Sequence, residues 1–104
     1  MANGPKFPKS VLDQFEQMQQ ALIAAQAELA EQTVTGSAGG GVVLVTVTGD
    51  QRCTAVEINP EILKEADAEL LQDLVLTAFN QALTASRQLA ADKLGPLSVG
   101  MDLA

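Results

Sequence analysis

The sequence contains no histidine, no tryptophan and no tyrosine, and its single cysteine is Cys53. Without histidine, the chain offers neither a nucleophile paired with a base nor a cluster of ligands for a transition metal. One cysteine excludes an internal disulfide and fits a reducing compartment, and we expect it to be a small packing residue within a strand. We therefore expect no enzymatic activity, no metal and no cofactor.

Basic residues are scarce as well. Six lysines and arginines stand against 13 acids, which gives a formal net charge of −7. This balance keeps a protein soluble and argues against indiscriminate binding to polyanions. The first residues lack the apolar core of a signal peptide, and the charge-free stretch is too rich in glycine and threonine to span a membrane. The 104 residues are therefore expected to form one cytoplasmic domain with an aliphatic core.

Residues 33–58 carry little charge and are rich in glycine, threonine and valine, which favours strands. Gly49-Asp50 predicts a two-residue hairpin turn, because glycine supplies the positive φ that such turns need. Pairing across this turn sets Val43 opposite Val56. One face of the sheet is then core, lined by Val43, Val45, Val47, Val56 and Ile58. The other face is expected to meet a partner, with Val42, Leu44, Thr46 and Ala55 as the candidate dimer interface beside Cys53 and Glu57.

A first helix is expected over residues 10–31. Ser10 followed by Asp13 resembles a helix-capping pair, and neither proline nor glycine appears between Ser10 and Gly36. Apolar residues recur in steps of four and three at Val11, Phe15, Met18, Leu22, Ala25 and Leu29. This stripe fits a helix packed on its own sheet and equally a seam against a partner chain, and both alternatives stay open.

A second long helix is predicted from about Asp67 to Leu94, after a short helical turn at Asn59-Pro60-Glu61. At 1.5 Å per residue it is roughly 40 Å long, so its far end is expected to project or to meet another chain. Gly95-Pro96 is expected to stop it. The predicted organisation is a flexible arm at 1–9, one domain at 10–94 and a flexible tail at 95–104.

Several segments together resemble the YbaB/EbfC family of bacterial nucleoid-associated proteins. They are Val34-Thr35-Gly36, the glycine run 39–41 before a valine strand, Val56-Glu57-Ile58-Asn59-Pro60, and residues 70–75 and 78–82. The resemblance implies an α+β subunit of the order α-β-β-β-α, with a small antiparallel sheet flanked by two long helices. It also implies a homodimer with projecting helices that binds double-stranded DNA in the nucleoid, a type of protein that in some cases regulates transcription.

The candidate DNA contacts are the basic residues near the expected helix ends, namely Lys6, Lys9, Arg87 and Lys93. If those ends meet, they form a local positive patch despite the net charge. If they lie far apart, a dimeric adaptor that binds a protein partner through its glutamine-rich helices or apolar tail gains support. No helix rich in arginine or asparagine is visible, so any DNA binding is expected to be weak and poor in sequence discrimination.

Overall fold

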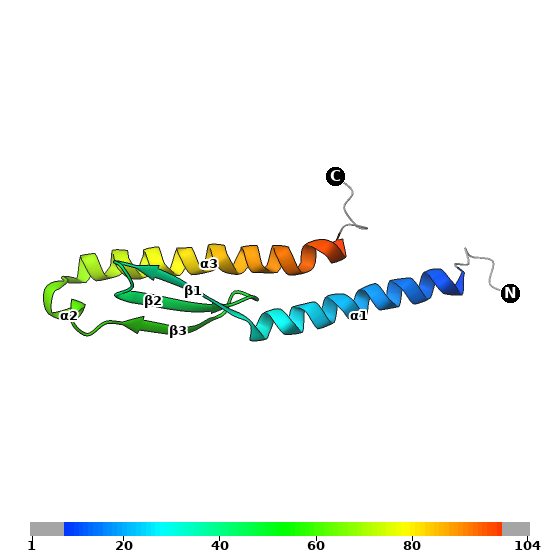
Figure 1. Cartoon of the computed structure of the whole chain (residues 1–104), viewed down its shortest axis with the longest axis horizontal. Helices are drawn as coiled ribbons and strands as arrows, with labels where there is room; N and C mark the ends of the chain where they lie inside the picture. The colour runs from blue at the N-terminus through cyan, green and yellow to red at the C-terminus, as the bar shows by residue number, and fades with distance from the viewer. Residues whose placement is uncertain (1–7, 99–104) are drawn as a thin grey trace.

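The structure is a computed structural model that describes residues 8–98 (Figure 1). Its elements are α1 (Lys9–Glu31), β1 (Thr33–Ala38), β2 (Val43–Thr48), β3 (Cys53–Ile58), α2 (Ile62–Glu65) and α3 (Ala68–Ser98). The strands form one antiparallel sheet in the order β1-β2-β3. The α+β class and the order of the two long helices and three strands are therefore confirmed, with α2 following the expected turn.

The core lies between α3 and the central strand. Val43, Val45 and Val47 of β2 are fully buried, because alternate residues of a strand share one face. They meet Ala78 and Ala82 of α3, which are also fully buried. The core face predicted for β2 is thus confirmed.

Gly36 has no side chain, and this allows the backbone of α3 to pack directly against the backbone of β1. A Cβ added at Gly36 would lie 2.1 Å from the carbonyl oxygen of Ala78 and 2.5 Å from the backbone nitrogen of Ala82. On the same strand, the backbone N–H of Ser37 donates to Oε1 of Gln81 at 2.6 Å. The helix is therefore bound directly to the edge strand.

The turn between β2 and β3 differs from the prediction. Residues 49–52 form a four-residue loop, in which Gln51 has a φ of 68° and donates its N–H to the carbonyl of Thr48 at 2.9 Å. Val43 consequently lies opposite Ile58, two residues from its predicted partner. A shift of two keeps Val56 and Ile58 on the core face, so the predicted pairing was wrong although that face was right. A register shift between Thr46 and Val47 sets Cys53 opposite Val47, whereas Cys53 had been predicted on the other face.

β3 is covered less than the sequence suggested. Val56, on the core face, is 47% exposed, because α3 lies over β1 and β2. Cys53 is exposed at the first position of β3, so its prediction as a packing residue was wrong. Val42, predicted on the face opposite the core with Leu44, precedes β2 and packs against the core cluster instead.

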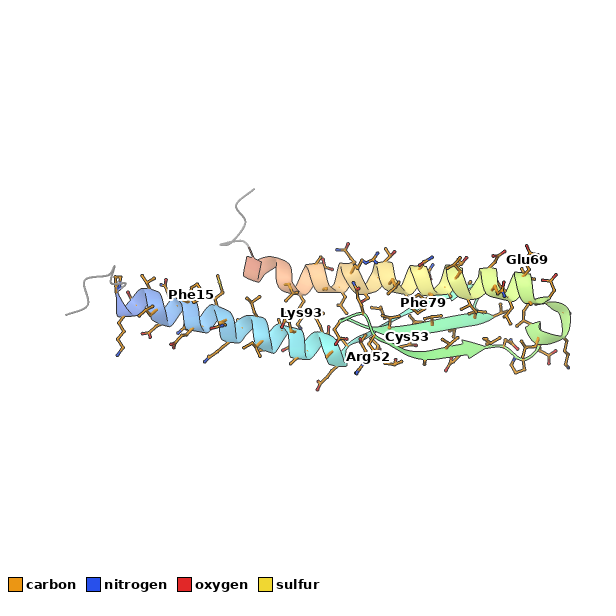
Figure 2. The ribbon with its side chains drawn as sticks, turned by 180° about the vertical axis from the view of Figure 1, so that it is seen from behind. Phe15, Arg52, Cys53, Glu69, Phe79 and Lys93 are labelled. Carbon is orange, nitrogen blue, oxygen red and sulfur yellow. The ribbon has the colours of Figure 1, made fainter. Side chains whose placement is uncertain are left out.

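α1 does not cover the sheet but extends away from it (Figure 1). It begins at Lys9, and no side-chain hydrogen bond caps it, so the predicted cap at Ser10 is absent. Its buried residues are Ala25 and Leu29, near its C-terminal end, whereas Phe15 is 67% exposed on the projecting part (Figure 2). Packing of the whole apolar stripe on the chain's own sheet was therefore the wrong alternative.

α3 begins after Asp67, whose Oδ1 accepts the backbone N–H of Leu70 at 2.8 Å. It continues through Gly95 and Pro96 to Ser98, so the predicted stop was wrong. Proline removes one hydrogen bond from a helix, and this helix tolerates that loss near its end. Residues 1–7 of the predicted arm and 99–104 of the predicted tail lie outside the described residues.

The subunit is strongly elongated. Its extents are 76 × 26 × 22 Å and its radius of gyration is 21.0 Å. A compact chain of this length would have a radius of gyration of about 13 Å. The long shape arises because α1 and the C-terminal end of α3 extend beyond the sheet (Figure 1).

Candidate nucleic-acid interface

Lys9 occupies the far end of the projecting helix. It is the first residue of α1 and is exposed, at the end of the molecule opposite α2 (Figure 1). No acidic side chain within residues 8–98 forms an ion pair with it. Lys9 is therefore available to a phosphate group, whereas Lys6 lies outside the described residues.

Lys93 is already paired. Its Nζ forms an ion pair with Oε2 of Glu28, and the Lys93 side chain is only 27% exposed. Lys9 precedes Glu28 by 19 positions, which is about 28 Å along α1. Within one subunit the structure therefore does not bring the start of α1 and the end of α3 together into one basic patch.

Arg87 and a second arginine, Arg52, lie next to one hydrogen-bond network. Arg87 is exposed and follows Ser86, whose Oγ donates to the carbonyl of Thr48 at 2.7 Å. Arg52 donates its backbone N–H to Oγ1 of Thr48 at 2.9 Å, and its carbonyl accepts the N–H of Thr48 at 2.8 Å. Both arginines thus project from segments bonded to the same residue. Arg52 was not predicted as a contact, because it was expected inside the strand after Gly49-Asp50; in the structure it lies in the loop 49–52 and forms no ion pair within residues 8–98.

Most of α1 is unfavourable to a polyanion. Between Lys9 and Glu31 it carries four acids, Asp13, Glu16, Glu28 and Glu31, against one base. Residues 17–27 between these acids carry no charge. Because phosphate contacts need lysine or arginine, a duplex would meet attraction only at the tip of this helix.

An apolar groove follows α3 on the flank that faces away from β1. It is lined by Leu71, Gln72, Val75, Leu76 and Phe79 (Figure 2 labels Phe79). Gln81 faces β1, and at 3.6 residues per turn Leu76 and Phe79 lie roughly 140° to 160° around the helix from it. Leu76 is 60% exposed, and Val56 on the core face of β3 is 47% exposed. This groove is an uncovered apolar surface on α3.

The predicted dimer interface lies on the other face of the sheet. Leu44 and Thr46 are half-buried at its centre, and Ala55, opposite Thr46 on β3, is exposed. No helix covers this face (Figure 1). The subunit therefore presents two uncovered surfaces at the sheet, an apolar groove beside α3 and a mixed open face.

Within residues 8–98, no group of three or more histidine, cysteine, aspartate or glutamate residues is placed to hold a metal ion. In the same part of the chain, no helix has the length and hydropathy needed to cross a bilayer. The basic side chains that form no ion pair within residues 8–98 are Lys9 at the tip of α1, Arg52 in the loop 49–52 and Arg87 on α3.

These features define an elongated α+β subunit with a three-stranded sheet, a projecting helix and a few separated basic side chains. The model of the YbaB/EbfC DNA-binding family matches residues 6–101, and the chain belongs to this family. A nucleoid-associated protein of Rhodococcus erythropolis is 46% identical over 88% of this chain and 82% of its own length. One of Corynebacterium glutamicum is 45% identical over 88% of both chains.

A solved structure supports the same fold. An uncharacterized protein from Helicobacter pylori superposes with a TM-score of 0.67, covering 93% of this chain and 98% of its own. Only 18% of the aligned residues are identical. The order and arrangement of the elements are thus shared at low sequence identity.

Proposed function

We propose that this protein acts in the bacterial nucleoid as a homodimer that binds double-stranded DNA with low sequence specificity. The observation that carries the proposal is the match of nearly the whole chain to a DNA-binding family. Lys9, exposed and without an ion pair among the described residues, is the principal phosphate contact, and Arg52 and Arg87 are further ones. With so few bases, we expect a low affinity and little readout of base edges.

A second copy of the chain completes the sheet layer. The radius of gyration of 21.0 Å and the exposed Leu76 and Val56 are unusual for a subunit that works alone. We assign the partner to the apolar groove on α3, because four of its five lining residues are apolar and Leu76 within it is 60% exposed. The open face around Leu44 remains the competing interface.

Two single substitutions separate these interfaces. Leu76→Asp places a charge in the groove and is expected to convert the dimer into monomers, because a desolvated, unpaired charge costs several kcal/mol. Leu44→Asp on the open face is the matched control and is expected to leave the dimer intact. Light scattering at micromolar concentration should give about twice 10.9 kDa for the wild type and for Leu44→Asp. A monomeric Leu44→Asp beside a dimeric Leu76→Asp would move the interface to the open face.

Charge reversal at Lys9 tests the DNA contact. Lys9→Glu is expected to weaken duplex binding and to lower the slope of log affinity against log salt by about 1.8, because two lysines per homodimer each contribute about 0.9. The matched control is Lys64→Glu on α2, at the opposite end of the molecule (Figure 1). Fluorescence anisotropy of a labelled duplex at several salt concentrations measures both quantities. Equal losses in the two variants would show that only net charge matters.

An adaptor function is the second candidate, and the projecting part of α1 favours it. Val11, Leu12 and Phe15 are 43%, 51% and 67% exposed, an apolar surface that a phosphate backbone does not need. In this alternative the homodimer binds a protein through α1 and contacts DNA little or not at all. A dimer that fails to bind duplex DNA at low salt would favour it.

A further inference from the structure

α1 is held to the rest of the subunit only near its C-terminal end. Ala25 and Leu29 are its buried residues, and Gln32 alone links it to β1. Leu29 and Leu94 of α3 line one cavity at this junction. Residues 9–24 of α1 extend beyond this junction. From here on we call them the arm, which is distinct from the N-terminal segment predicted at 1–9. The junction therefore sets the direction of the arm.

The loop 49–52 clamps the last turn of α1. The N–H of Gly49 donates to the carbonyls of Leu29 and Gln32, each at 2.9 Å. A Cβ at Gly49 would lie 2.7 Å from Cδ2 of Leu29, so the loop and the helix are in close contact. Thr48, directly before this loop, is bonded in turn to Ser86 of α3. The loop therefore connects α1 to α3.

The ion pair between Lys93 and Glu28 lies on the same junction. Among residues 8–98 it is the one ion pair that joins α1 to α3. Its lysine is mostly covered, at 27% side-chain exposure, so salt screens it less than a fully exposed pair. In Figure 2, Lys93 is labelled where the two helices run side by side.

We propose that Lys93 is a positioning residue whose ion pair with Glu28 fixes the direction of the arm and so the place where Lys9 meets DNA. The part that concerns DNA rests on the proposed function, whereas the direction of the arm does not. Lys9 lies about 28 Å from Glu28 along α1, so a 10° turn at the junction moves it by about 5 Å. That displacement exceeds the axial rise of about 3.4 Å per nucleotide in one DNA strand.

The competing role for Lys93 is direct contact with a phosphate group. Glu28→Gln separates the two roles, because it breaks the ion pair but leaves Lys93 charged. A phosphate-binding Lys93 would be released and would bind DNA more tightly. A positioning Lys93 would lose its hold on the arm. Glu31→Gln, which removes the same charge one turn further along α1, is the matched control.

Spin-label distances measure the arm directly. Labels at Gln17→Cys on the arm and Thr84→Cys on α3, in a Cys53→Ser background, report its direction within one subunit when labelled protein is diluted into an excess of unlabelled protein. Glu28→Gln and Lys93→Glu are expected to broaden the distribution and to shift it by about 3 Å for a 10° turn. The ratio of displaced to docked arms should rise about two- to five-fold. Lys93→Arg and the swap of Lys93→Glu with Glu28→Lys should restore the wild-type distribution.

The outcomes decide between the roles. Unchanged distances in both Glu28→Gln and Lys93→Glu would overturn the positioning role, whatever the variants do to DNA binding. Tighter DNA binding by Glu28→Gln than by Glu31→Gln, measured by anisotropy, would assign Lys93 to a phosphate contact and would also overturn it. If the wild type binds no DNA, the proposed function fails, and the distances still show whether Lys93 positions the arm.

Discussion

Replacing Gly36 with alanine is expected to destabilise the subunit by about 3 kcal/mol or more, a large part of a total of roughly 5–15 kcal/mol. The added Cβ would lie 2.1 Å from the carbonyl oxygen of Ala78 and 2.5 Å from the backbone nitrogen of Ala82. Both are backbone atoms, which cannot rotate away as a side chain can. α3 must therefore move off β1, and the contacts of Ala78 and Ala82 with the buried valines of β2 are lost with it.

Gly40→Ala provides the matched control for Gly36→Ala. A Cβ at Gly40 meets no atom within 4 Å, and its only cost is the positive φ of 73°. That conformation costs an alanine about 1 kcal/mol relative to glycine. Urea unfolding at one fixed protein concentration measures both variants, because dimerisation makes apparent stability depend on concentration. If the two substitutions shift the midpoint equally, the backbone contact between β1 and α3 contributes little.

Replacing Val45 with aspartate is expected to prevent folding. Val45 is fully buried at the centre of β2, and the core cluster around it consists of apolar side chains only. A carboxylate placed there has no charged partner, and an uncompensated buried charge costs about 3–5 kcal/mol in addition to the packing lost. Circular dichroism should show the loss of helix and strand signal at 25 °C.

Thr35→Asp is the control for Val45→Asp. Thr35 lies on β1 opposite Thr46, on the open face of the same sheet, and is exposed. The variant introduces the same side chain into a strand without burying it, so its spectrum should match that of the wild type. A folded Val45→Asp protein would mean that water reaches the core of the sheet layer.

The fold followed from the sequence where a single pattern determined it. Alternating valines in β2 identified the buried face, because a strand shows its two faces with a period of two. The same period hid the error in the β2–β3 pairing, since a shift of two residues leaves Val56 and Ile58 on the same face. The four-residue loop depends on bonds from Gln51 and Arg52 to Thr48, which the dipeptide Gly49-Asp50 did not reveal.

The candidate site was less accessible to sequence reasoning, because it depends on which segments meet in space. Lys93 was predicted to be available for a DNA contact. In the structure α1 and α3 run antiparallel, and Lys93 forms an ion pair with Glu28. Arg52 had no predicted role, and the hydrogen bond from Ser86 to Thr48 brings its loop to α3. The sequence also did not indicate that β3 is left uncovered, because Val56 follows the same alternation as the buried valines of β2.

The central claim is that a homodimer of this chain binds duplex DNA through a few basic side chains. Titration of a labelled duplex with the wild-type protein at low and at moderate salt tests it most directly. We expect retardation at micromolar protein in low salt, no preference between unrelated sequences, and a shallow salt slope set by a handful of contacts at about 0.9 each. No retardation at tens of micromolar protein in low salt would contradict the claim and leave the adaptor function in its place.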